Sequence, residues 1–381
     1  MRSIYLDNAA TTKIKQEVFE SMLPYFKEYW HNPSSLYSPA TKIKEDIERA
    51  RKNVGNFIGA SGDEIYFCSG GSEANCFAIS GFCHLHNLHN TNPTIITSNV
   101  EHKSVLECVK NMIADIYYVD VDEFGFIDIE MLEDLMQNAH NKSNKILVSI
   151  QFANNEIGTI QNISNIARLV HKYNGVLHTD AVQAIGQIPI NVKELGIDLL
   201  SCSGHKLGAP KGIGFLYRRN GVEIAPLIYG SQMDFMRGGS ENVPYIIGLS
   251  KAIDFCDVSL VKIDEMCEKR DYFIDLLERK FDCELNGDSY YRLPNNINVT
   301  FPQNITGEAL LYTLDMSGIK ISTGSACNSK SIEPSPTLKA IGLTNEQAMR
   351  TIRISLSDDI TYEEIDYVID EIDKSLKLIE T

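Results

Sequence analysis

Short runs rich in β-branched and aromatic residues alternate with amphipathic stretches over the first two thirds of the chain, and this alternation constrains the fold most strongly. The clearest runs are EIYFCS (64–69), TIITS (94–98), KILVSIQF (145–152), GVLHTD (175–180), DLLSCS (198–203) and GIGFLY (212–217). Helical spacing separates several of them, as at Ile163, Ile166, Ala167 and Val170. Strand–helix–strand repetition predicts an α/β fold with a mostly parallel sheet covered by helices on both faces.

The pattern changes after about residue 255. A long helical stretch leads into NNINVTF, a second helix near residues 308–316 and a late TIRISL run before a final helix. A chain of 381 residues is long enough for two domains. We therefore expect a large domain at residues 16–255 and a smaller α/β domain made of residues 1–15 plus 256–381.

Composition excludes several classes of function. The net charge of −16 argues against direct binding of nucleic acid, which requires clustered Lys and Arg. The apolar runs are short and broken by charges, so no membrane span is expected. The N-terminus has no basic-then-apolar signal, and the nine cysteines lack the spacing of a disulfide framework. These features predict a cytoplasmic protein.

The residues that directly follow the predicted strands are polar and reactive. SGGSEAN follows the first run as a glycine-rich turn that opens a helix, and its free N–H groups suit a phosphate. The later runs are followed by His102, Asn154, Asp180 with Gln183, and Lys206. Ligands of open parallel sheets bind at the carboxyl ends of the strands, so these groups should meet. Together they indicate a site for pyridoxal phosphate (PLP).

The chemistry of PLP requires these residue types. Lys206 supplies an amine that can form a Schiff base, and Asp180 supplies a carboxylate that keeps the pyridine nitrogen protonated. The phosphate cradle and its neighbours are Gly71, Ser72, Ser203 and His205. Taken singly, a turn glycine, a capping aspartate or a surface lysine is common in proteins. Independent accidents would not all fall at one end of one sheet.

The sequence resembles the NifS/IscS-type cysteine desulfurases of the class V aminotransferase family from residue 5 to about 356. The similar stretches are YLDNAATT, NPSSLYS, SGGSEAN, EHKSV, ANNEIGTIQ, HTDAVQAIGQIPI, DLLSCSGHKLGAPKGIG, GGSENVP, GSACNSKSIEPS and IRISL. The resemblance implies the aspartate aminotransferase-like fold of PLP-dependent transferases (fold type I) and a homodimer. It also implies a reaction in which L-cysteine becomes L-alanine.

By this resemblance Cys327 is the catalytic nucleophile that takes the sulfur as a persulfide and delivers it to an acceptor protein. We interpret its polar surroundings, ISTGSACNSK, as a mobile loop that lets the thiolate reach the substrate and then swing out. Lys330, three residues later, would favour the thiolate. Iron–sulfur cluster scaffolds and enzymes of tRNA or cofactor thiolation all remain possible acceptors.

The resemblance also assigns the other site residues. Lys206 holds the cofactor and moves the Cα proton, His102 stacks on the ring, Asp180 meets the pyridine nitrogen and Gln183 the ring hydroxyl. The phosphate contacts are Gly71, Ser72, Ser203, His205 and, from the neighbouring subunit, Ser240, whereas Asn154 and Arg353 hold the substrate near the cofactor. The planar guanidinium of Arg353 would grip the substrate carboxylate bidentately.

The sequence departs from the family at Cys76, where asparagine is usual, and in the segment before Ser240. Cysteines and histidines between residues 76 and 89 lack the tight ligand pairs of zinc sites, so no metal is expected. Two alternatives to a desulfurase stay open. One is a selenocysteine lyase or another class V PLP enzyme, and the other is an inactive sulfur-relay scaffold.

Overall fold

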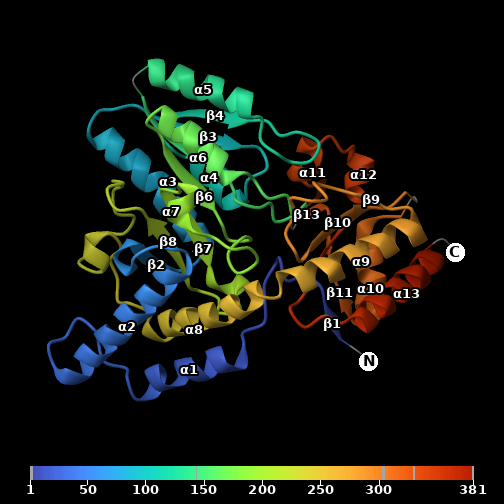
Figure 1. Cartoon of the computed structure of the whole chain (residues 1–381), viewed down its shortest axis with the longest axis horizontal. Coiled ribbons are helices and arrows are strands. Elements are labelled where there is room, and N and C mark those ends of the chain that lie inside the picture. Colours follow the sequence, from blue (N-terminus) through green and yellow to red (C-terminus); the bar gives the residue numbers. More distant parts are fainter. Residues whose placement is uncertain (1–2, 143, 303–304, 329–330, 380–381) are drawn as a thin grey trace.

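The computed structural model describes residues 3–142, 144–302, 305–328 and 331–379 (Figure 1). Its largest sheet has seven strands in the order β2-β8-β7-β6-β5-β3-β4. Their bounds are β2 Ile65–Cys68, β3 Pro93–Ser98, β4 Asp115–Val119, β5 Lys145–Ser149, β6 Val176–Asp180, β7 Leu199–Ser203 and β8 Gly214–Arg218. Within this sheet β8 runs antiparallel to both of its neighbours, and the other pairs are parallel. The expected mostly parallel sheet is confirmed.

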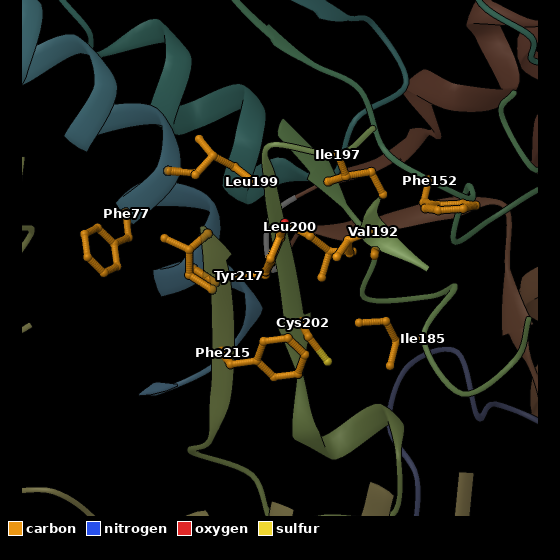
Figure 2. Close-up of a cluster of buried hydrophobic side chains, with 14 of the residues drawn as sticks. Phe77, Phe152, Ile185, Val192, Ile197, Leu199, Leu200, Cys202, Phe215 and Tyr217 are labelled. Atoms are coloured by element: carbon orange, nitrogen blue, oxygen red, sulfur yellow. The ribbon is translucent and has the colours of Figure 1, made fainter. Parts of the chain in front are cut away.

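Helices cover the sheet on both faces (Figure 1). The helices of this half are α1 Gln16–Lys27, α2 Ser38–Phe57, α3 Gly71–Leu88, α4 Lys103–Lys110, α5 Ile129–Asn141, α6 Ile163–Lys172, α7 Val192–Leu195 and α8 Val243–Leu260, of which α1 packs on α8. All residues of β2, β3 and β7 are buried, which explains why these strands read as nearly continuous apolar runs. Figure 2 shows Phe77 of α3 in the same buried cluster as Leu200 of β7 and Phe215 of β8.

A second buried cluster lies around a four-stranded antiparallel sheet with the order β12-β15-β10-β9. The elements of this half are β9 Glu284–Leu285, β10 Asn296–Thr300, β12 Ser322–Thr323, β15 Thr351–Ser355, α9 Ile263–Phe281, α10 Gly307–Met316 and α13 Tyr362–Ile379. The N-terminal strand β1 (Ile4–Tyr5) pairs with β11 (Ile319–Lys320), so the start of the chain joins this half. The two clusters favour the proposed division into two domains, which stays a prediction.

The long helical stretch expected before NNINVTF consists of two helices. α8 packs Ile253 and Cys256 into the first cluster, and α9 packs Phe273 and Leu277 into the second. One straight helix could not bury side chains in both clusters, so the helix breaks between them. The expected boundary at residue 255 falls inside α8.

The expected polar loop around Cys327 forms a hairpin. β13 (Ser325–Asn328) and β14 (Ser331–Pro334) pair antiparallel, with Cys327 opposite Ile332. The two short strands satisfy each other's backbone groups, which an irregular loop would leave to water. At its base Gly324 donates to Thr351 O (2.8 Å) and Ser335 donates to Gly324 O (2.9 Å). The side chain of Cys327 and all of Lys330 lie outside the described residues.

The remaining short helices, α11 (Pro336–Ala340) and α12 (Asn345–Met349), follow this hairpin. Across the described ranges, no helix combines the length and the apolar character needed to cross a membrane.

Candidate active site

A cavity of about 410 Å³ lies at the carboxyl ends of the central strands. The predicted residues that line it are Gly71, Ser72, His102, Asp180, Gln183, Ser203, His205, Lys206 and Arg353. They come from segments spread over nearly 300 residues, and the strand ends bring most of them together as the parallel sheet predicts. Arg353 reaches the same cavity from β15 of the second sheet.

Asp180 is the last residue of β6 and is buried. Its Oδ2 accepts a hydrogen bond from Asn75 Nδ2 (2.7 Å), and its Oδ1 accepts one from the backbone N–H of Val182 (3.0 Å). These two donors fix the direction of the carboxylate inside the cavity wall. A buried, oriented carboxylate is the group that a protonated ring nitrogen requires.

Lys206 follows β7 at the end of a short 3-10 helix. Its Nζ donates hydrogen bonds to the carbonyls of Ala9 and Ala10, the latter at 2.7 Å. Burial and, after it, the positive charge of Arg353 together lower the pKa of Lys206 to about 8. Near neutral pH a larger fraction of this amine is therefore uncharged, and so nucleophilic, than for a surface lysine.

The first turn of α3 forms the floor of the cavity. A Cβ atom on Gly71 would lie 2.7 Å from Cγ2 of Val182, so only glycine lets the backbone lie this close. The free N–H groups of this turn suit an anion, as expected for the Gly71–Ser72 pair. Across the cavity, burial and the charge of Lys206 lower the pKa of His205 to about 4, so its imidazole is neutral.

His102 caps the N-terminus of α4, and its ring belongs to a chain of hydrogen bonds. Nδ1 of His102 accepts the N–H of Ser104 (3.1 Å), which places the ring proton on Nε2. The Ser104 hydroxyl lies 2.7 Å from the same ring nitrogen and accepts from Asn75 Nδ2 (2.9 Å). Asn75 thus connects His102, through Ser104, with Asp180.

Asn75 and Ser104 line the cavity, yet sequence reasoning gave them no role. Asn75 lies within SGGSEAN and Ser104 within EHKSV, two of the stretches that resemble the desulfurase family. Their contact joins α3 to α4 and depends on how these helices pack. The only available signal was their position in these two motifs.

Arg353 is held by groups from distant parts of the chain. One terminal nitrogen donates to Asp7 Oδ1 (2.7 Å), and the other donates to the carbonyl of Asn155 (3.0 Å). Its Nε is buried without a hydrogen-bond partner among the described residues. Sequence reasoning missed Asp7, although it lies within YLDNAATT. Arg353 thus enters the cavity with a carboxylate already bound.

Gln183 lines the cavity and donates to Ala9 O (3.0 Å). Asn154 is buried and turned to the backbone: Nδ2 donates to Val100 O (3.1 Å), and Oδ1 accepts the N–H groups of Glu156 and Ile157. Its neighbour Asn155 lines the cavity instead. The predicted contact of Asn154 with the substrate is not seen here and stays a prediction.

Ser240 is exposed and does not line the cavity of its own chain. Its predicted contact is with the cofactor of a neighbouring subunit, so that contact also stays a prediction. In the same segment Arg237 forms an ion pair with Glu73 in the first turn of α3 (2.9 Å). The segment before Ser240 is thus joined to the phosphate end of the cavity.

Comparison with known proteins identifies the family. A model of the class V aminotransferases matches residues 4–368. Cysteine desulfurase IscS of Dictyoglomus turgidum is 44% identical over 386 aligned residues, covering 100% of this chain and 96% of that protein. This chain belongs to the NifS/IscS-type cysteine desulfurases. Enzymes of this family depend on PLP.

Solved structures of the desulfurase family share the whole fold. A NifS-like protein superposes with a TM-score of 0.90 at 34% identity, covering 99% of this chain and 100% of that chain. SspA in complex with cysteine superposes with a TM-score of 0.80 at 33% identity, covering 93% of this chain and 99% of that chain. The expected fold type I is confirmed.

Proposed function

We propose that this chain is a PLP-dependent cysteine desulfurase that converts L-cysteine to L-alanine and keeps the sulfur as a persulfide on Cys327. One observation carries the proposal. Lys206, Asp180 and the first turn of α3 meet in a cavity of about 410 Å³ that Arg353 also lines. Full-length relatives named cysteine desulfurase support the choice of substrate.

The cavity fits PLP. Gly71 leaves room for a phosphate group against the first turn of α3, where a side chain would collide with Val182. Asp180 would hold the protonated ring nitrogen, and Lys206 would hold the cofactor through its amine. The remaining contacts follow the family: Ser72, Ser203 and His205 at the phosphate, Gln183 at the ring hydroxyl, His102 over the ring and Asn154 at its edge. When bound, PLP withdraws electrons from the α-carbon of an attached amino acid.

Arg353 would orient the substrate, and Lys206 would move its Cα proton. The Arg353 guanidinium offers two parallel N–H donors to the substrate carboxylate, a geometry that lysine cannot match. These donors contact Asp7 and Asn155 in the structure, so binding the substrate exchanges one of these partners for another carboxylate. Lys206, with its pKa lowered to about 8, can accept the Cα proton as a neutral amine.

The sulfur step belongs to Cys327 on the β13–β14 hairpin. Its thiolate attacks the sulfur of the substrate, an S–S bond forms, and the bond between that sulfur and Cβ breaks. The electron pair of the broken bond stays with Cβ, which is then protonated to give alanine. In sum, L-cysteine and the Cys327 thiol give L-alanine and a Cys327 persulfide.

The persulfide sulfur leaves Cys327 by transfer to an acceptor protein or by reduction to sulfide, and the acceptors are iron–sulfur cluster scaffolds or enzymes of tRNA or cofactor thiolation. We further propose a homodimer in which Ser240 of each chain completes the phosphate site of the other. The exposure of Ser240 and the ion pair between Arg237 and Glu73 support this arrangement. A cytoplasmic location stays a prediction from the cysteine content.

The decisive experiment measures alanine and sulfide formed from L-cysteine with a reductant and no keto acid. The variant Cys327→Ala should bind PLP and form neither product, whereas the matched control Cys267→Ala on α9 should match the wild type. Equal alanine formation by the wild type and Cys327→Ala would show that Cys327 is not the sulfur carrier. Strict dependence on selenocysteine would instead identify a selenocysteine lyase.

A further inference from the structure

The turn that follows β5 reaches from the wall of the cavity to the second half of the molecule. Asn155 lines the cavity, and its carbonyl accepts a hydrogen bond from Arg353 (3.0 Å). Two residues later, Ile157 is buried in a small apolar cluster with Leu338 of α11. Glu156 stands between these two contacts, so its side chain begins close to both the cavity and the segment that follows the β13–β14 hairpin.

Four hydrogen bonds fix the backbone of this turn. Asn154 Oδ1 accepts the N–H groups of Glu156 (2.8 Å) and Ile157 (3.0 Å). The carbonyl of Glu156 accepts Nδ2 of Asn296 (3.0 Å) and Nδ2 of Asn298 (3.2 Å), both on β10. None of these bonds uses the Glu156 side chain. The turn therefore holds that side chain in a fixed direction, and a substitution there leaves the four bonds in place.

The carboxylate of Glu156 accepts a hydrogen bond from the hydroxyl of Ser335. Ser335 is buried and directly follows β14. Its hydroxyl oxygen accepts the N–H of Thr337 (3.1 Å) and so caps α11, and its own N–H donates to Gly324 O (2.9 Å). A serine hydroxyl has one proton to donate, and Ser335 gives it to Glu156. Ser335 thus joins the base of the hairpin to the turn after β5.

The hairpin that carries Cys327 depends on the contacts at its base. Among the described strands, β13 and β14 pair only with each other. A two-stranded hairpin has little stability of its own, so the groups that hold its two ends set its direction. On the β13 side Gly324 donates to Thr351 O (2.8 Å). On the β14 side Ser335 is held by Glu156.

We propose that Glu156 is a positioning residue for the sulfur step, because its bond to Ser335 fixes the direction in which the hairpin presents Cys327 to the substrate. This inference rests on the proposed role of Cys327 as the sulfur carrier. Glu156 does not line the cavity, so it acts through the hairpin and not on the substrate. Attack of one sulfur on another requires close approach and alignment, and a misplacement of about 1 Å can lower a rate by roughly 10²-fold.

The first test separates the sulfur step from substrate binding. Rapid-quench measurement of the first alanine formed, over a range of L-cysteine concentrations, gives a maximal rate and a half-saturation concentration. In Glu156→Ala the maximal rate should fall about 10- to 100-fold. The half-saturation concentration should stay unchanged, because Asn155 and Arg353 keep their contact. Glu156→Gln keeps an oxygen that can accept from Ser335 and should restore most of the rate. Glu346→Ala, an exposed glutamate on α12, is the matched control and should equal the wild type.

A double-variant cycle tests the bond itself. Ser335→Ala removes the donor to Glu156 together with the cap of α11, so its own rate should fall. If Glu156 acts through Ser335, adding Glu156→Ala to Ser335→Ala should cause no further loss. Hydrogen exchange of the holoenzyme gives a readout that does not depend on turnover. The amides of β13 and β14 should exchange faster in Glu156→Ala than in the wild type, and those of α3 should not change.

The outcomes distinguish this inference from the proposed function. An unchanged maximal rate or unchanged hairpin exchange in Glu156→Ala would overturn the inference. A loss in the double variant as large as that caused by Glu156→Ala alone, added to the loss in Ser335→Ala, would also overturn it. Equal alanine formation by Cys327→Ala and the wild type would instead reject the proposed role of Cys327, whatever the exchange rates of the hairpin.

Discussion

The cavity has two walls that are built in different ways. Asp180 is the last residue of β6, and Ser203 is the last residue of β7. All residues of β7 and all but the first of β6 are buried, so the apolar core fixes both side chains in place. Arg353 comes from the second sheet and is positioned by an ion pair with Asp7, 346 residues away in the sequence. The large-sheet wall is therefore fixed by packing, whereas the Arg353 wall is fixed by a few polar contacts.

The difference matches the two tasks of the proposed enzyme. A cofactor that stays in place needs a surface that does not rearrange, and close packing supplies one. A substrate that binds and leaves needs groups whose partners can be exchanged, and the ion pair of Arg353 with Asp7 is exchangeable. Cys327, on the two-stranded hairpin, belongs to the exchangeable side.

The largest effect should come from Lys206 in the large-sheet wall. Lys206→Ala removes the amine that holds the cofactor and moves the proton, so alanine formation should fall by about 10³-fold or more. Lys211→Ala, an exposed lysine five residues later, is the matched control and should leave the rate unchanged. Activity within about tenfold of the wild type in Lys206→Ala would contradict the assignment.

The second test concerns the Arg353 wall. Asp7→Asn keeps the shape but removes the carboxylate that the substrate displaces from Arg353, so KM for L-cysteine should fall, with a smaller change in kcat. A charged hydrogen bond contributes about 1.5–3 kcal/mol, which corresponds to a fall of roughly 10- to 150-fold at most. Steady-state kinetics measures both constants. A higher KM in Asp7→Asn would show that Asp7 stays bound to Arg353 and orients it for the substrate.

The third test returns to the large-sheet wall. Asn75→Ala removes the donor that joins Asp180 to Ser104, and the buried carboxylate loses one of its two hydrogen bonds. About 1–2 kcal/mol is expected from such a loss, which corresponds to roughly tenfold weaker binding of PLP. Titration of the apoprotein with PLP, followed by its absorbance, measures the affinity. An unchanged affinity would show that Asn75 does not contribute to the binding of PLP.

The sequence predicted the two walls unequally. The strand-end residues could be predicted because each follows a recognisable buried run and because the ends of parallel strands meet. Asp7 could not be paired with Arg353, since local patterns do not report contacts between the two ends of a chain. The pattern also could not tell which of Asn154 and Asn155 turns toward the cavity, because that depends on one turn of backbone. The hairpin at Cys327 was hidden by its small polar residues, which are typical of loops.

The smallest effect should show that the two walls communicate electrostatically. Burial and the charge of Arg353 keep the pKa of Lys206 near 8, so the neutral amine should increase as the pH rises through that value. The rate at which the apoprotein takes up PLP should follow this fraction.

Arg353→Gln tests the contribution of the Arg353 charge. Without that positive charge the protonated form of Lys206 is less disfavoured, so the midpoint of PLP uptake should move to higher pH by less than about one unit. Arg350→Gln, on the same segment but bonded to Pro302 O, is the control and should keep the wild-type midpoint. If the midpoint does not move in Arg353→Gln, burial alone lowers the pKa of Lys206, and the two walls act independently.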